Sequence, residues 1–364
     1  MIGQAIGGDV RALSRLLSVV EEGGPDGHRA LKSLYPRVGE AHLVGVTGAP
    51  GAGKSSLIAR LVREIRKGSV SRKIAVIAVD PTSPLSRGAL LGDRLRLHEL
   101  DADEPAGVGG RVAGADSSGV RAEGDPGAVP GAAGAGAAVG GLSGIFFRSQ
   151  GTRGHRGGLA RTTGDLAAVF DACGYDLIIL ETVGSGQAEY AVRAHCDTLI
   201  LVATPGMGDE IQALKAGVLE LADLIVVNKA DRPGAGKAAG ELKEALGLGR
   251  EKPTPEAPVW TPPILTLSAL TGEGLPALAG ALASHRRFLE QAVGLDELRL
   301  KRAAAAVGEL ATALILERLA RDTAGAGGGG DLLETLARRV IAGEIDLLEA
   351  ADFMVEKLFR ISNV

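Results

Sequence analysis

The chain has 364 residues, 45% hydrophobic and 23% charged, proportions typical of a folded globular protein. Its formal net charge of −4 provides no excess of cations for a phosphate backbone, which argues against a dedicated nucleic-acid binder. Without a run of about 18 apolar residues or a signal-peptide pattern, and with two cysteines far apart, Cys173 and Cys196, we expect a cytoplasmic protein that does not enter a membrane.

The first elements expected are helices. Residues 8–37 carry a helical pattern that is interrupted at Gly23-Gly24-Pro25. A second short helix over 27–34 ends before Pro36, because the residue before a proline disfavours the helical conformation. We therefore expect residues 1–40 to form an N-terminal helical extension. The apolar residues at helical spacing are Leu13, Leu16, Leu17 and Val20.

Apolar strands then alternate with amphipathic helices. This alternation is typical of a doubly wound, mainly parallel α/β sheet covered on both faces, and we expect it over residues 41–280. Such sheets bind ligands at the carboxyl ends of their strands. The strands are expected at 42–47, 73–80, 176–181, 198–204, 224–228 and 264–268, and the helices at 55–67, 159–172, 209–221 and 235–246.

Two stretches interrupt this pattern. Residues 101–144 are rich in Gly and Ala with few large apolar side chains, so we expect a flexible inserted loop. Residues 323–330 are a Gly-rich linker. The remainder, 281–364, is expected to be a helical arm that dimerises, with a break near Gly294 and, after the linker, a helix opened by a capping box at Asp331 and a last helix from about Asp346.

The segment after the first strand matches the phosphate-binding pattern GxxxxGK[ST]. Its glycines allow backbone N–H groups to surround phosphate oxygens, and the following helix adds its positive end. Lys54 is expected to reach the β- and γ-phosphates, and Ser55 to ligate Mg²⁺. The nucleotide-binding residues expected here are Gly48, Ala49, Pro50, Gly51, Ala52, Gly53, Lys54, Ser55 and Ser56.

A second motif predicts the base. Asn228-Lys229-Ala230-Asp231 follows a strand and matches the NKxD pattern of GTPases. A carboxylate at Asp231 would accept hydrogen bonds from guanine, whereas adenine would leave polar groups unpaired. Alone, the motif could be a polar turn; behind a phosphate loop it favours GTP. Ser268-Ala269-Leu270 resembles a further base-contacting loop, which is a weaker signal.

Carboxylates at two other strand ends predict the hydrolytic chemistry. Asp80 and Glu181 would face the γ-phosphate and hold Mg²⁺, and the Gly184 N–H would contact the γ-phosphate. Asp93 has two equal interpretations, a metal or water-positioning group or a structural carboxylate such as a helix cap. Gln187 could position a water or could equally be a solvated side chain. We therefore expect GTP hydrolysis to GDP with Lys54, Asp80, Asp93 and Glu181 as catalytic residues.

Taken together, these segments resemble the ArgK/MeaB family of G-protein chaperones, from about Gly8 to the C-terminus apart from the insertion. The segments that carry the resemblance are VTGAPGAGKSSL, VIAVDPTSP, GDRLRL, TRGHRGGLAR, ETVGSGQAE, PGMGDEIQALKAGVLELAD and VVNKADRPGA. The resemblance implies a SIMIBI-class P-loop GTPase that forms a homodimer. Its partner would be an adenosylcobalamin-dependent acyl-CoA mutase, of the methylmalonyl-CoA mutase type, whose cofactor it helps to load or protect.

The chain differs from this family pattern between Leu100 and Ile145, where relatives are expected to have a short connection. Two other functions stay open. One is a kinase or ATPase linked to arginine and ornithine uptake, the family's older description. The other is a metal-insertion GTPase, which would need a Cys/His cluster that Cys173, Cys196 and His195 do not supply by spacing.

Overall fold

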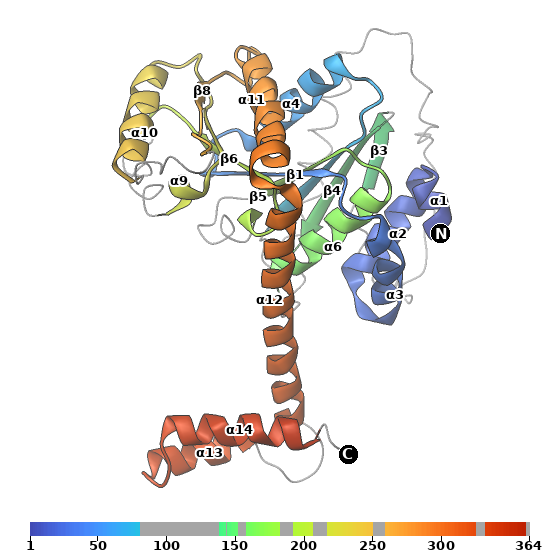
Figure 1. Ribbon diagram of the computed structural model, residues 1–364, viewed down its shortest axis with the longest axis vertical. Coiled ribbons are helices and arrows are strands. Elements are labelled where there is room, and N and C mark those ends of the chain that lie inside the picture. The colour runs from blue at the N-terminus through green and yellow to red at the C-terminus, as the bar shows by residue number, and fades with distance from the viewer. Residues whose placement is uncertain are drawn as a thin grey trace, which may run out of the picture. The chain divides into compact units, whose positions relative to one another are not determined.

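The computed structural model describes residues 1–80, 138–142, 144–151, 158–182, 192–206, 217–249, 259–324 and 332–361. The chain divides into two compact units, Met1–Leu298 and Arg299–Val364. The first unit contains a sheet with helices on both faces, and Figure 1 shows the elements in chain order by colour.

Eight strands of the described residues form one sheet in the order β3-β4-β2-β5-β1-β6-β7-β8. All neighbouring strands are parallel except β3 and β4, which pair antiparallel. This confirms the mainly parallel α/β class. The bounds are β1 (His42–Gly48), β2 (Ile74–Asp80), β3 (Ala138–Leu142), β4 (Ile145–Gly151), β5 (Leu177–Thr182), β6 (Thr198–Ala203), β7 (Leu224–Val227) and β8 (Ile264–Thr266).

Helices cover both faces of the sheet, which explains why the strands are apolar along their whole length. Successive residues of β5 point to opposite faces, so Ile178 belongs to one buried cluster and Ile179 to the other. The first cluster lies under α2, α3 and α6, and the second under α4 and α11 (Figure 1). The helices of this unit are α1 (Ile2–Ile6), α2 (Val10–Glu22), α3 (Gly24–Leu34), α4 (Lys54–Gly68), α6 (Gly158–Ala172), α9 (Val218–Leu221), α10 (Ala235–Gly249) and α11 (Leu275–Phe288), with a 3₁₀ turn η1 (Tyr35–Arg37) and a π-helical turn η2 (Leu289–Val293).

The N-terminal helices are held to the sheet by both apolar and charged contacts. Asp9 caps α2, accepting a hydrogen bond from Ala12 N at 2.8 Å, and Leu16 and Leu17 are fully buried. Arg148 of β4 is 2% exposed and forms an ion pair with Glu21 at the end of α2. The extension is therefore fixed to the strand β4 by a charge pair as well as by apolar packing.

Replacing Glu21 with alanine is expected to lower the free energy of unfolding by about 3 kcal/mol, because the buried Arg148 cation loses the carboxylate with which it pairs. Urea unfolding followed by circular dichroism would measure this. Glu22→Ala, which alters the exposed neighbouring residue, is the matched control and should change stability by about 0.5 kcal/mol or less. Equal effects of the two substitutions would contradict the assigned role of the pair.

The edge formed by β3 and β4 is not among the expected strands. β3 lies within residues 101–144, for which we expected a flexible loop, and this expectation is wrong for Ala138–Leu142. A strand at a sheet edge needs backbone pairing with one neighbour, here β4, and does not need large side chains. Residues 101–137 lie outside the described part of the chain.

The second unit, Arg299–Val364, is helical. The long helix α12 (Leu295–Ala324) begins directly after Gly294, whose positive φ of 78° ends the preceding turn at the expected break. Helices α13 (Leu332–Ile341) and α14 (Leu347–Ile361) pack on each other. Among the described residues, every helix is too short or too polar to span a bilayer.

Candidate nucleotide site

The loop between β1 and α4 has the backbone shape that its glycines allow. Gly48 has a φ of 142°, and a Cβ there would lie 2.1 Å from the carbonyl oxygen of Val202. Gly53 has a φ of 84°, and a Cβ there would lie 2.6 Å from Nδ2 of Asn228. Any side chain at these two positions would thus be strained and would collide with a neighbouring strand or loop. The close approach fixes the loop at the carboxyl end of the sheet.

Lys54 is the first residue of α4 and is 7% exposed. Its Nζ donates to the carbonyl oxygens of Gly48 at 2.8 Å and Ala49 at 3.0 Å. The ammonium is thus held inside the loop that it follows. A positive charge on a short loop rich in backbone N–H groups is suited to binding phosphate oxygens.

Two oxygen-bearing side chains meet beside this loop. Ser55 Oγ donates a hydrogen bond to Oε1 of Glu181, which is 6% exposed at the end of β5. Next to it, Thr182 Oγ1 donates to Thr47 Oγ1 at 3.1 Å. The sequence did not single out Thr47 or Thr182; the only signal was their position at strand ends. A hydroxyl and a carboxylate are the type of oxygen ligand that Mg²⁺ prefers.

Asn228 links three segments that are far apart in sequence. Its Nδ2 donates to Ala52 O at 2.8 Å, and its Oδ1 accepts from Ala269 N at 3.0 Å. This side chain therefore ties the loop after β7 to the phosphate loop. Lys229, with a φ of 61°, donates from Nζ to Gly51 O at 2.6 Å. These contacts hold the loop after β7 against the phosphate loop.

Asp231 is exposed at the edge of this arrangement and accepts a hydrogen bond from Ser268 Oγ. This hydrogen bond, the largest cause, lowers the pKa of the Asp231 carboxyl. Ser268 Oγ in turn accepts from Thr271 N at 3.2 Å, so the hydroxyl has a fixed direction. An ionised, oriented carboxylate can accept the paired N–H donors of a guanine edge.

Replacing Ser268 with alanine is expected to weaken binding of GTP without changing the fold, because Asp231 loses the group that orients it. The pKa of Asp231 should rise toward its ordinary value. Base recognition needs the ionised carboxylate, so the loss of affinity at acid pH should begin at a higher pH in the variant. Fluorescent GTP titrations across pH would measure both effects. Ser284→Ala, on α11, is the control, and an unshifted pH profile in Ser268→Ala would contradict this role.

The structure places the expected residues as follows. Lys54, Ser55 and Glu181 meet at one end of the sheet, while Asn228 joins the phosphate loop to Ala269. Asp80 ends β2 opposite Gly151 of β4. Pro50, Ser56 and Leu270 are exposed. The expected residues outside the described part of the chain are Asp93 and Gly184, together with Gln187.

Comparisons with known proteins agree with this geometry. The family model described as methylmalonyl-CoA mutase-associated GTPase MeaB matches residues 13–125 and 137–324. The match continues beyond Leu100 and leaves only 126–136 unmatched inside it, so the expected departure from Leu100 to Ile145 is too long.

Individual relatives extend the match to nearly the whole chain. A putative GTPase of Pyrococcus horikoshii is 36% identical over 351 residues, covering 96% of this chain and 95% of the relative. The mouse mitochondrial methylmalonic aciduria type A homolog is 32% identical over 262 residues, covering 71% of this chain and 52% of the relative. The crystal structure of a LAO/AO transport system kinase has a TM-score of 0.65 at 24% identity, covering 98% and 96% of the two chains, which shows a shared fold.

Proposed function

The chain belongs to the family of methylmalonyl-CoA mutase-associated GTPases called MeaB, and from this we propose that its GTP hydrolysis serves an adenosylcobalamin-dependent acyl-CoA mutase. Nucleotide binding and GTPase activity follow from the family. The finer role, loading or protecting the mutase cofactor, is supported by the family's description and by the similarity to the methylmalonic aciduria type A homolog. The observation that supports the nucleotide part of the proposal is that Asn228 bonds both to Ala52 of the phosphate loop and to Ala269 of the loop that we propose contacts guanine.

In the proposed mechanism, the chain acts by positioning and by charge. Lys54 would exchange its hydrogen bonds to Gly48 O and Ala49 O for contacts to the phosphates. The backbone N–H groups of the loop would stabilise negative charge on the transferring phosphoryl group. Asp231 would select guanine. The catalytic roles of Asp80 and Asp93 stay proposals from the sequence.

The oxygen ligands at the site fit a magnesium ion. Ser55 and Glu181 are already adjacent, and we propose that they hold Mg²⁺ directly or through water, together with Asp80. When bound, the ion would neutralise charge between the β- and γ-phosphates. The donor set contains no thiolate or imidazole, which suits a hard cation rather than a transition metal.

We also propose that the chain forms a homodimer through its C-terminal helices, in line with the expected division into residues 1–40, 41–280 and 281–364. Large apolar side chains are exposed on α13 and α14, among them Ile341 at 87%, Leu347 at 77% and Leu348 at 72%. A second copy covering these side chains would remove them from water. Leu348→Asp should give a monomer in light scattering; a wild-type monomer would contradict the proposal.

The two buried free cysteines are consistent with the cytoplasmic location that we propose.

The experiment that tests the proposal measures GTP hydrolysis with and without a purified adenosylcobalamin-dependent methylmalonyl-CoA mutase. We expect a complex in gel filtration and a faster release of phosphate in its presence. The absence of both, with intact GTP hydrolysis by the chain alone, would overturn the mutase role. Labelling with GTP radioactive at the γ-phosphate tests the older kinase description, which predicts transfer to a protein rather than release as phosphate.

A further inference from the structure

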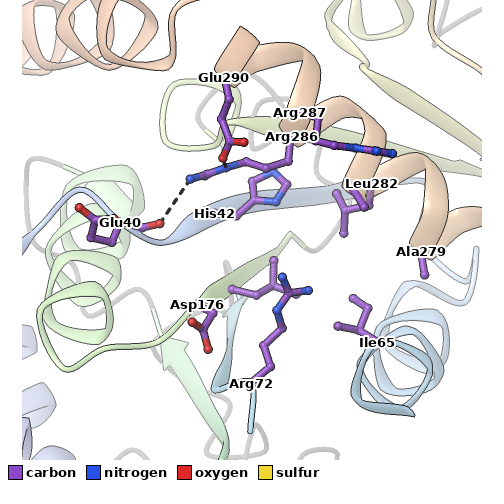
Figure 2. Close-up of a pocket in the computed structure, with 12 residues that line it drawn as sticks. Glu40, His42, Ile65, Arg72, Asp176, Ala279, Leu282, Arg286, Arg287 and Glu290 are labelled. Carbon is purple, nitrogen blue, oxygen red and sulfur yellow. Dashed lines mark hydrogen bonds and ion pairs between the residues drawn. The ribbon is translucent and has the colours of Figure 1, made fainter. Parts of the chain in front are cut away.

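A cavity lies at the amino end of the sheet, opposite to the phosphate loop. It has a volume of about 400 Å³ and is lined by the starts of β1 and β5 and the segment before β2, by the last turn of α4 and by α11 with η2. Figure 2 shows side chains from all these elements around one space. Lys54 begins α4, whereas Ile65 in its last turn lines the cavity, so the helix separates the two sites. The cavity is therefore no part of the nucleotide site.

The three arginines that line the cavity differ in how they are bonded. The Arg286 side chain is already bonded to residues around the cavity: it pairs with Glu290 and donates from Nη1 to Ala41 O at 3.4 Å. Arg72, by contrast, makes no hydrogen bond or ion pair with its side chain within the described part of the chain. Arg287 donates only to Ser284 Oγ at 3.2 Å among the described residues. A guanidinium has five N–H donors, so with respect to the described residues Arg72 and Arg287 keep donors available for an anion.

The rest of the lining limits where an anion can lie. Glu40 and Asp176 occupy one side of the cavity in Figure 2, and the apolar side chains Ile65, Ala279 and Leu282 the other. A negative group is repelled from the first side and can lie over the second, in the cavity that Arg72 and Arg287 also line. An apolar body next to that group would contact the aliphatic surface.

The histidine that lines the cavity, His42, contributes a neutral ring to its surface and no charge. His42 is 9% exposed, and its Nε2 lies 2.7 Å from Thr198 Oγ1. Burial lowers the pKa of His42 to about 3, against the opposing charge of Asp197. The ring is therefore neutral near pH 7, and the positive charge facing the cavity comes from the arginines.

We propose that this cavity binds a small organic anion, with a carboxylate or phosphate between Arg72 and Arg287 and a compact apolar body over Ile65, Ala279 and Leu282. The concave shape and the volume favour a small molecule, since ligand cavities span about 300–1,000 Å³. A protein partner would instead need about 800 Å² of surface on each side.

The test uses the full chain saturated with GDP and Mg²⁺, so that the phosphate loop is blocked. Benzoate and phenyl phosphate are the two probes, and benzyl alcohol is the uncharged match. Isothermal titration calorimetry should detect at least one of the anions, and the tighter of the two identifies the head group. Benzyl alcohol should bind at least tenfold more weakly than that anion. Failure of both anions to bind at millimolar concentration would overturn the proposal, whatever the outcome for GTP hydrolysis.

Variants locate the bound probe. Arg72→Gln and Arg287→Gln alter exposed side chains and should each weaken binding about tenfold, while Arg11→Gln, an exposed arginine on α2, should leave it unchanged. Ala283→Phe should abolish binding by filling the cavity without removing a charge. Binding that survives Ala283→Phe, or that weakens equally in Arg11→Gln, would place the anion elsewhere and overturn the assignment.

Discussion

Replacing Lys54 with alanine is expected to lower kcat/KM for GTP about 10²–10³-fold, the range seen when one preorganised donor to a developing charge is removed. The structure gives the reason, because the Lys54 ammonium is buried inside the phosphate loop and no other described lysine donates to Gly48 O or Ala49 O. Phosphate release from GTP, measured under single-turnover conditions, reports the effect.

Lys67→Ala is the matched control for Lys54→Ala. Lys67 lies on the same helix, its side chain is 73% exposed, and it pairs with Glu64 at 2.7 Å on the surface. Such a pair contributes little to stability, so we expect wild-type hydrolysis. If Lys54→Ala kept wild-type hydrolysis while folding normally by circular dichroism, the phosphate loop could not be the catalytic element.

Replacing Asp231 with asparagine is expected to change which base the protein selects. In the role that we propose, the Asp231 carboxylate would accept hydrogen bonds from the two N–H groups of guanine, whereas the amide of asparagine would oppose one of them with its own donor. We expect kcat/KM for GTP to fall about 10²-fold or more, because a site with unpaired polar groups discriminates strongly. Xanthosine triphosphate, which has a carbonyl in place of the guanine amine, should become the better substrate.

The control for Asp231→Asn is Asp26→Asn, at an exposed surface pair with Arg29 where the side chain is 76% exposed. It removes the same charge far from the loops of the site and should leave the preference for GTP intact. Hydrolysis of GTP, xanthosine triphosphate and ATP by each variant would be compared. Unchanged selectivity in Asp231→Asn would mean that another residue reads the base.

The sequence predicted the central part of the fold well, because the strands there are buried on both faces. β1, β5 and β6 are continuous apolar runs, and their expected ranges differ from the observed ones by a residue or so. β4 was missed for the opposite reason. It carries Arg148, Ser149 and Gln150 in succession, two of them buried, and a polar sequence does not show that its partners lie on other elements.

The site was predictable where motif and backbone geometry coincide. Gly48 and Gly53 belong to a motif that predicts a loop requiring glycine, and the structure shows that Asn228, part of the second motif, bonds to that loop. The contact between Ser268 and Asp231 was beyond the sequence, because it depends on two loops 37 residues apart meeting in space. The cavity near Arg72 was equally hidden, since its walls come from five separate segments with no shared motif.

The hydrogen bonds of Asn228 have a consequence for how the two ends of the nucleotide are recognised. One side-chain amide is bonded both to Ala52 in the phosphate loop and to Ala269 in the loop after β8, which we propose contacts the base. Whatever orders one loop therefore lowers the entropic cost of ordering the other. Guanosine and inorganic pyrophosphate should bind with positive cooperativity. Through this shared amide, the binding free energy of the intact nucleotide should be more favourable than the sum of the binding free energies of its two parts.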